Sequence, residues 1–137
     1  MISLMVLFFL IFTLLISSMV FKEPIRRFSR ASEEYTMVSP TQSTVFFWPQ
    51  VVSADGVSES TVKIFLLSKN NTPITNKRVR LVTTLGEMVK GEQSAPVEGK
   101  KYYEFRVKSN EVGTAVLTVT TDDSVQLQQK PSIQFTK

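Results

Sequence analysis

The sequence contains no cysteine and no histidine. Without thiol and imidazole groups, it has no cysteine nucleophile, no Ser-His-Asp triad and none of the usual zinc ligand sets. The absence of cysteine also excludes disulfide bonds and leaves the redox compartment undecided. We therefore expect no enzymatic activity, no cofactor and no metal site.

Clusters of one charge sign are missing as well. The net charge is +4, of which +1 falls in residues 22–37 and +3 in residues 38–137, with acidic and basic residues interspersed. A nucleic-acid-binding surface would need a basic stripe with aromatic residues between the charges. No window of the sequence offers one, so we expect no nucleic-acid partner.

The first twenty-one residues, Met1 to Phe21, lack charge altogether, and fourteen of them are Ile, Leu, Val or Phe. As a helix, this segment would span about 31 Å, which matches the hydrocarbon core of a bilayer. Its apolar residues would contribute about 4 to 8 kcal/mol to membrane insertion. The sequence therefore predicts a long hydrophobic helix surrounded by membrane lipid or by copies of itself.

Three interpretations of this segment compete. A cleaved signal peptide fits least, because no basic residue precedes the apolar run and Ser17 to Val20 offer no clean cleavage site. The other two are a lasting membrane anchor and the core of a filament. Thr13 and Ser17 form a small-xxx-small pair that would let helices approach closely, although both hydroxyls can equally bond their own backbone.

Residues 22–37 can continue the helix beyond the membrane, with Ile25, Phe28 and Tyr35 on one face. Pro24 should kink this helix, and it must end before Pro40. We therefore expect two parts. The first is a hydrophobic helix with an amphipathic extension over residues 1–37, and the second is a β domain over residues 38–137.

Beyond Pro40, short alternating runs rich in Val, Thr, Ile and Phe are separated by turn residues about every ten positions, a pattern typical of an all-β sandwich. Val62, Ile64 and Leu66 are expected to face inward from one strand, and Tyr103, Phe105 and Val107 from another. The expected strands are Thr44–Trp48, Ser60–Leu67, Val79–Thr84, Lys101–Lys108, Gly113–Thr120 and Ser132–Thr136.

An aromatic cluster stands in the first of these strands. Alternation must turn at least one of Phe46, Phe47 and Trp48 outward, and Phe65 and Leu67 also point away from the predicted core. These five residues are candidates for contact with another subunit or with a protein partner. The alternative is packing in the core and along a sheet edge.

Two loop features have simpler explanations. The acidic residues Asp55, Glu59, Asp122 and Asp123 lack the regular spacing of a calcium loop, and a loop aspartate more often bonds its own turn. Asn70 begins an Asn-x-Thr triplet on an expected hairpin tip, which makes it a candidate glycosylation site.

The region from Thr41 to Thr120 resembles the immunoglobulin-like repeats of the bacterial invasin and intimin family. The resemblance rests on the Ala54-Asp55-Gly56 turn, the Asn71-Thr72-Pro73 hairpin, Val79-Arg80-Leu81 and the closing run Val112 to Val119. It implies an immunoglobulin-like sandwich without the usual disulfide, used as an extracellular spacer or adhesive surface. It brings no catalytic residues. We expect the chain to depart from the family pattern in having one such module and no outer-membrane barrel.

The N-terminal part is similar to the stem of type IV pilin-like subunits. The shared features are an apolar run from the first residue, Pro24, and the basic Arg26, Arg27 and Arg30, although Met5 stands where many bacterial pilins have a glutamate. Basic residues after the apolar run alone would keep the C-terminal domain in the cytoplasm. A pilin-like precursor resolves this conflict, because processing removes its basic leader.

These observations predict an immunoglobulin-like sandwich preceded by one long hydrophobic helix, located at the cell surface. The favoured role is a filament subunit whose helices form the core and whose sandwich forms the outer surface. The alternatives are a membrane-anchored adhesion or spacer module and an accessory subunit of a membrane complex.

Overall fold

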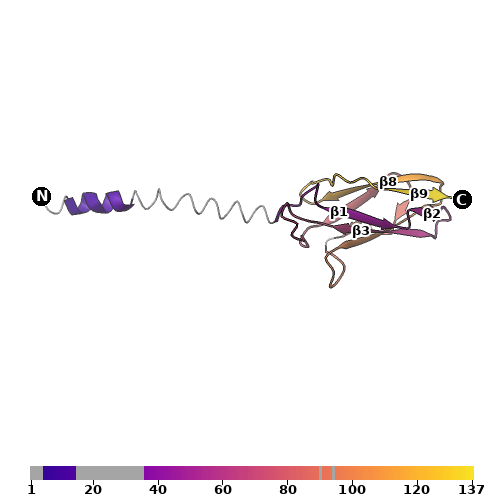
Figure 1. Cartoon of the computed structure of the whole chain (residues 1–137), viewed down its shortest axis with the longest axis horizontal. Helices are drawn as coiled ribbons and strands as arrows, with labels where there is room; N and C mark the ends of the chain where they lie inside the picture. Colours follow the sequence, from indigo (N-terminus) through magenta and orange to yellow (C-terminus); the bar gives the residue numbers. More distant parts are fainter. Residues whose placement is uncertain (1–4, 15–35, 90, 94) are drawn as a thin grey trace. The chain divides into compact units, whose positions relative to one another are not determined.

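The computed structural model describes residues 5–14, 36–89, 91–93 and 95–137. The chain divides into two units, Met1–Tyr35 and Thr36–Lys137, which we describe separately. Within the second unit, the described residues form nine strands in two sheets (Figure 1). Their bounds are β1 Thr44–Trp48, β2 Val51–Ser53, β3 Glu59–Phe65, β4 Val79–Thr83, β5 Glu87–Met88, β6 Glu92–Gln93, β7 Tyr103–Lys108, β8 Gly113–Thr121 and β9 Ser132–Thr136.

The two sheets form a sandwich. One sheet has the order β1-β3-β7-β5 and the other has the order β2-β9-β8-β4-β6. All pairs are antiparallel except β2 with β9, which are parallel. Figure 1 shows β1 and β3 in one layer and β8 and β9 in the other.

The chain changes sheets between β1 and β2. The Trp48–Pro49 peptide bond at this point is cis. The buried Ser60 on β3 donates its hydroxyl to the carbonyl oxygen of Pro49 at 2.8 Å, which holds the crossing strand against the first sheet. The N-terminal part of the sandwich therefore contributes an edge strand to each layer.

The core lies between the sheets and follows from alternation in the strands. Val62, Ile64, Tyr103, Phe105 and Val107 face inward from β3 and β7, as the sequence predicts. Close packing of such side chains against the opposite sheet removes their apolar surface from water. The opposite sheet supplies Leu81, Ala115, Leu117, Val119, Ile133 and Phe135.

The predicted strand bounds hold for β1 and β9 and shift by one or two residues elsewhere. β3 ends at Phe65 rather than Leu67, because the next residues bond the following loop: Ile74 donates its N–H to Leu66 and Ser68 donates its N–H to Thr72. The strands β2, β5 and β6 were not predicted. They have two or three residues each, too few to show alternation.

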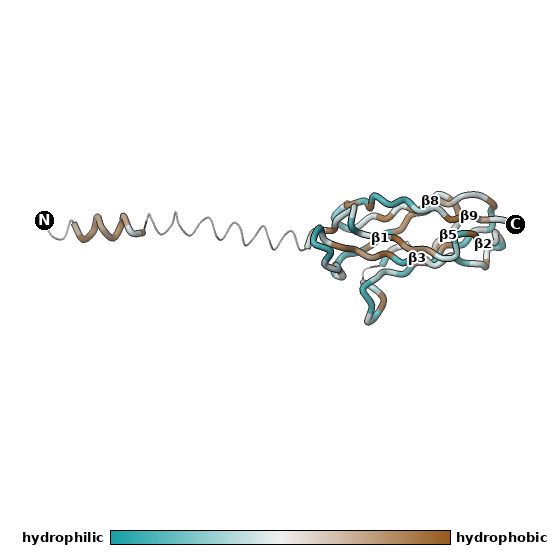
Figure 2. Tube along the Cα trace, in the orientation of Figure 1, coloured by the Kyte–Doolittle hydropathy of each residue, from teal (hydrophilic) through white to brown (hydrophobic). Residues whose placement is uncertain are grey.

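In the first unit, residues 5–14 form a helix whose side chains are all exposed. Figure 2 shows it apolar along most of its length. No helix among the described residues is both long and apolar enough to cross a membrane. The predicted span to Phe21 and its extension to Met37 fall largely outside those residues.

Candidate functional site

The outer face of the four-stranded sheet carries the exposed aromatic residues of β1. Alternation buries Val45 and turns Phe46 and Trp48 outward, with 59% and 77% of their surfaces exposed. Phe47 points the other way and packs against the core. The sequence predicted that at least one of the three aromatics faces outward, and two of them do. The alternative, core packing, describes Phe47.

The pairing register brings residues of three strands together beside these rings. Phe46 lies opposite Lys63 on β3, which lies opposite Glu104 on β7. Trp48 lies opposite Thr61 in the same way. Directly opposite residues lie close enough for their side chains to interact.

Three rings and one ammonium group are in contact on this face. The rings of Phe46 and Phe65 meet edge to face at 5.7 Å between centroids, and Phe65 meets Tyr102 at 5.4 Å. The Lys63 ammonium lies 5.0 Å from the centre of the Tyr102 ring. Edge-to-face and cation–π contacts of this kind orient rings with modest energies, about 0.5 to 1.5 kcal/mol each.

An open depression of about 640 Å³ lies on the same face. We call it the β1 groove, and define it by its lining residues Phe46, Phe47, Trp48, Thr61, Lys63 and Glu104. Three of the six are polar and three are aromatic, and of the aromatic residues Phe46 and Trp48 point outward. A concave surface with aromatic walls and a few polar groups has the composition of a binding site.

The charges beside the β1 groove are largely paired. Arg106 stands between Glu59 and Glu104, with nitrogen-to-oxygen distances of 3.6 and 3.9 Å. Exposed pairs at such distances contribute little to stability. Their effect is that both carboxylates already face a cation.

Glutamine side chains bond backbone groups on two strands of this sheet, the edge strand β1 and the strand β7. The backbone N–H of Val45 on β1 donates to the side-chain oxygen of Gln129 at 2.8 Å. The amide of Gln93 bonds both the N–H and the carbonyl of Glu104 on β7. Pro49, which follows β1, has no N–H to offer. A partner is therefore expected to contact side chains on the face rather than to add a strand at the edge.

Leu67 does not line the β1 groove. It forms an isolated bridge with Pro73, and its N–H donates to the hydroxyl of Ser43 at 3.0 Å. This position beyond the end of β3 assigns it to a loop. Sequence reasoning missed Thr61, Lys63, Tyr102 and Glu104 as groove neighbours, since only the register of β1, β3 and β7 brings them there.

The loop candidates lie in turns and loops as the sequence predicts, except Glu59, which is the first residue of β3. Asn70 is exposed in a turn, and its N–H donates to the hydroxyl of Ser68 at 3.2 Å. Its glycosylation stays a prediction. Among the described residues, no group of three or more acidic side chains could hold a metal ion.

Asp55 bonds its own turn, as expected for a loop aspartate. Its carboxylate accepts the N–H groups of Val57 and Ser58 at 2.8 and 2.6 Å, and the Ser58 hydroxyl at 2.7 Å. These hydrogen bonds lower the pKa of Asp55 from 3.8 to about 2, and those from Ser58 have the largest effect. Elsewhere, Asp123 pairs with Lys77 at 2.5 Å and raises the pKa of that ammonium.

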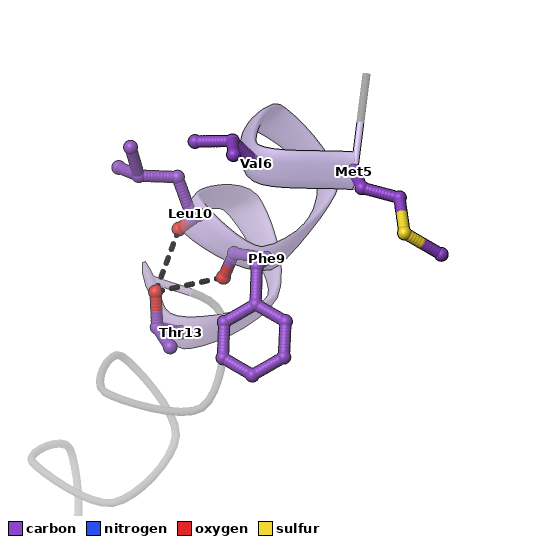
Figure 3. Close-up of a pocket in the computed structure, with 5 residues that line it drawn as sticks. All are labelled: Met5, Val6, Phe9, Leu10 and Thr13. Carbon is purple, nitrogen blue, oxygen red and sulfur yellow. Dashed lines mark hydrogen bonds between the residues drawn. The ribbon is translucent and has the colours of Figure 1, made fainter. Parts of the chain in front are cut away.

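Thr13 is the member of the predicted helix-association set that the structure describes. Its hydroxyl is 2.9 Å from the carbonyl oxygens of both Phe9 and Leu10, one turn earlier (Figure 3). This is the backbone-bonded alternative, in which the hydroxyl needs no neighbouring helix. Met5, Val6, Phe9, Leu10 and Thr13 line a shallow apolar surface. Ser17 and Pro24 lie outside the described residues.

The profile of the family described as Invasin, domain 3 matches residues 39–137. A comparison with curated protein sequences gives no match. Among solved structures, the chain is similar to invasin, a bacterial integrin-binding protein, with 25% identity and a TM-score of 0.64. This match covers 74% of the chain and 20% of that structure, so the chain spans about a fifth of its length.

Two further structures support the same fold. The adhesin InvE of Yersinia pseudotuberculosis shares 27% identity with a TM-score of 0.62, over 72% of this chain and 27% of InvE. A C-terminal fragment of intimin, solved in complex with the intimin-binding domain of its receptor Tir, shares 19% identity with a TM-score of 0.59. That match covers 73% of this chain and 33% of the fragment, and at this identity it shows the fold alone. The sandwich is thus immunoglobulin-like and of the invasin and intimin type.

Proposed function

This chain belongs to the invasin domain 3 family, and from that premise we propose that its sandwich is an adhesion or spacer module at a cell surface. The module has no enzymatic role and contacts a protein partner through the outer face of β1, β3 and β7. Similar solved structures carry the names of an integrin-binding protein and an adhesin. Those names support the adhesive class and do not identify this chain's partner.

One observation supports a particular surface as the site of contact with the partner. Phe46 and Trp48 expose two large aromatic side chains side by side on a sheet face. Apolar rings on a protein surface are costly in water and contribute strongly when a partner buries them. Trp is among the residues most often found at the centre of protein contacts.

The N-terminal helix is the proposed membrane tether. Its described part, residues 5–14, carries no charged residue. A helix that is apolar all round is stable only when lipid or other protein surrounds it. The filament role predicted from the pilin-like features has no support from the family match or from the similar structures, so it stays a prediction.

Display at the surface is tested on intact cells that express the chain with an epitope tag after Lys137. We expect protease added outside the cells to remove the tag, while a cytoplasmic marker survives. Protection of the tag until the cells are lysed would contradict display. Mechanical shearing followed by electron microscopy tests the filament role, which predicts thin fibres composed of this chain.

Adhesion is tested with beads that carry the full chain in detergent or in lipid particles. Beads with the wild-type chain should bind target cells, and Phe46→Ala and Trp48→Ala should each lower the bound fraction several-fold. The matched control is Val57→Ala, because Val57 is an exposed apolar residue in the turn after β2. Equal loss in all three variants would show that the β1 groove is not the contact surface.

A further inference from the structure

The hydrogen-bond acceptors and donors of the β1 groove differ in whether they already have partners within the protein. The carboxylates of Glu59 and Glu104, which would accept hydrogen bonds from a ligand, already face the guanidinium of Arg106. The backbone N–H and carbonyl of Glu104 are both taken by the amide of Gln93. Each carboxylate therefore has a cation nearby, and both backbone groups of Glu104 are hydrogen-bonded.

The donors of the β1 groove are not engaged. Within the part of the chain that the structure describes, the indole N–H of Trp48 and the hydroxyl of Thr61 have no hydrogen-bond partner. The ammonium of Lys63 contacts only the ring of Tyr102 among those residues. All three donors line the same depression as the rings of Phe46 and Trp48.

This inventory defines the chemistry of the ligand. It should present flat apolar rings to the aromatic side chains and acceptors to the three donors, with few donors of its own. Proline meets these demands, because its ring is apolar and its tertiary amide has a carbonyl but no N–H. In a polyproline II helix those carbonyls make no internal hydrogen bonds, and aromatic grooves recognise such helices.

Other occupants fit less well. A neutral sugar carries as many hydroxyl donors as acceptors, whereas the groove offers three donors and one carboxylate, Glu104, which has Arg106 nearby. An anionic ligand would find no excess positive charge on a face where Lys63 and Arg106 stand beside Glu59 and Glu104. Strand addition at β1 is opposed by Gln129, which occupies the N–H of Val45.

We infer that the β1 groove binds a proline-rich, uncharged peptide segment of a partner protein, which stacks on Phe46 and Trp48 and accepts hydrogen bonds from Trp48, Thr61 and Lys63. This inference rests on the proposed function and specifies its partner. The peptide comes from a different protein, since the six prolines of this chain are isolated: Pro24, Pro40, Pro49, Pro73, Pro96 and Pro131.

The test uses the full chain in a mild detergent and a fluorescein-labelled peptide of ten prolines. Fluorescence anisotropy should show saturable binding at concentrations of about 1 mM or below. A Gly-Ser peptide of equal length, which has N–H groups and no rings, should bind at least tenfold more weakly. Trp48 is the only tryptophan, so its emission reports on the groove directly, and unlabelled peptide should shift it to shorter wavelength.

Variants separate the ring from its donor. Trp48→Phe keeps an aromatic ring without the N–H and should weaken binding about fivefold, which is the effect of one hydrogen bond. Trp48→Ala should weaken it more than tenfold, and Val57→Ala should leave it unchanged. Circular dichroism should give the same spectrum for each variant, because both residues are exposed.

Three results would overturn the inference: equal affinity for the Gly-Ser peptide, unchanged affinity in Trp48→Ala, or a shift of Trp48 emission by maltohexaose but not by the proline peptide. These outcomes differ from a failure of the proposed function. If Phe46→Ala abolishes cell binding while the proline peptide fails to bind, the face remains the contact surface and only the proline assignment is wrong.

Discussion

The side-chain oxygen of Gln129 accepts the backbone N–H of Val45 at 2.8 Å, across 84 positions of the sequence. Val45 lies on the edge strand β1, and Gln129 lies in the segment before β9. The glutamine thus takes the place that a further strand would occupy beside Val45. An exposed edge is a template for aggregation, and such devices protect it.

Replacement of Gln129 by alanine should therefore lower the free energy of unfolding and open the edge. We expect a loss of about 1 to 2 kcal/mol, since the N–H of the buried Val45 loses its acceptor. Urea denaturation measures the loss, and chemical crosslinking measures association between copies. Gln128→Ala is the control at an adjacent exposed position. Equal effects of the two variants would contradict the role assigned to Gln129.

Tyr103→Phe should also destabilise the sandwich. The ring of Tyr103 is fully buried, and its hydroxyl donates to the carbonyl oxygen of Lys77 at 2.6 Å. The change keeps the packing and removes this hydrogen bond, at a cost of about 1 to 2 kcal/mol. Tyr102→Phe is the matched control on the adjacent residue, which is half-buried on the outer face, and should change stability by less than about 0.5 kcal/mol. A cost for Tyr103→Phe no larger than the control would show that the hydrogen bond contributes nothing.

The free energy of unfolding should decrease at acidic pH, because the turn at Asp55 depends on an ionised carboxylate. The folded pKa is about 2, below the ordinary 3.8, so the ionised carboxylate stabilises the turn above about pH 4. That contribution is lost as the pH falls from about 4 towards 2. Melting temperatures of the wild type and Asp55→Asn should therefore differ at pH 7 and converge towards pH 2. A difference that does not change with pH would contradict this assignment.

Ser58→Ala provides the control for that experiment. Its hydroxyl donates to Asp55 at 2.7 Å and is among the causes of the lowered pKa. Removal of the hydroxyl should raise the folded pKa of Asp55 and narrow the pH range over which stability is lost. The backbone N–H bonds of Val57 and Ser58 remain in this variant, so the shift should decrease without vanishing.

Gly86→Ala tests a close approach of two backbone segments. Gly86 has φ +83°, and a Cβ atom there would lie 2.4 Å from the carbonyl oxygen of Lys108. The left-handed conformation costs about 1 to 2 kcal/mol for alanine, and displacement of the β7 backbone adds about 1 to 3 kcal/mol. Gly99→Ala is the control, because Gly99 has φ +69° with open space around it. Urea denaturation should give about 1 to 2 kcal/mol for Gly99→Ala and a clearly larger loss for Gly86→Ala.

The fold was largely predictable because the pattern that specifies it is local. Alternation in residues 59–65 and 103–108 assigned Val62, Ile64, Phe105 and Val107 to the core, and these side chains are buried. The short strands were not predictable in this way. Glu87 and Met88 form β5 only because Lys108 and Val107 lie beside them.

The candidate site, like the fold, was predictable only where it depends on a local pattern. Alternation within β1, which five residues suffice to express, places Phe46 and Trp48 on one face of the strand and Phe47 on the other. Their neighbours follow from pairing across strands that are far apart in sequence: Lys63 opposite Phe46, and Glu104 opposite Lys63. A shift of register by one residue would exchange the two faces of a strand, and nothing in β1 alone specifies it.

The sequence by itself determined the class of this protein: an uncharged apolar N-terminal segment, a β sandwich without disulfide bonds, and at least one aromatic side chain of the first strand on a surface. These properties depend on composition and on a period of two residues. Only the tertiary structure decided that Gln129 covers Val45, that Arg106 pairs with Glu59, and that Trp48 keeps a free donor in a groove. Each of those contacts joins residues from different strands or loops, and their distances exist only after the sheets have formed.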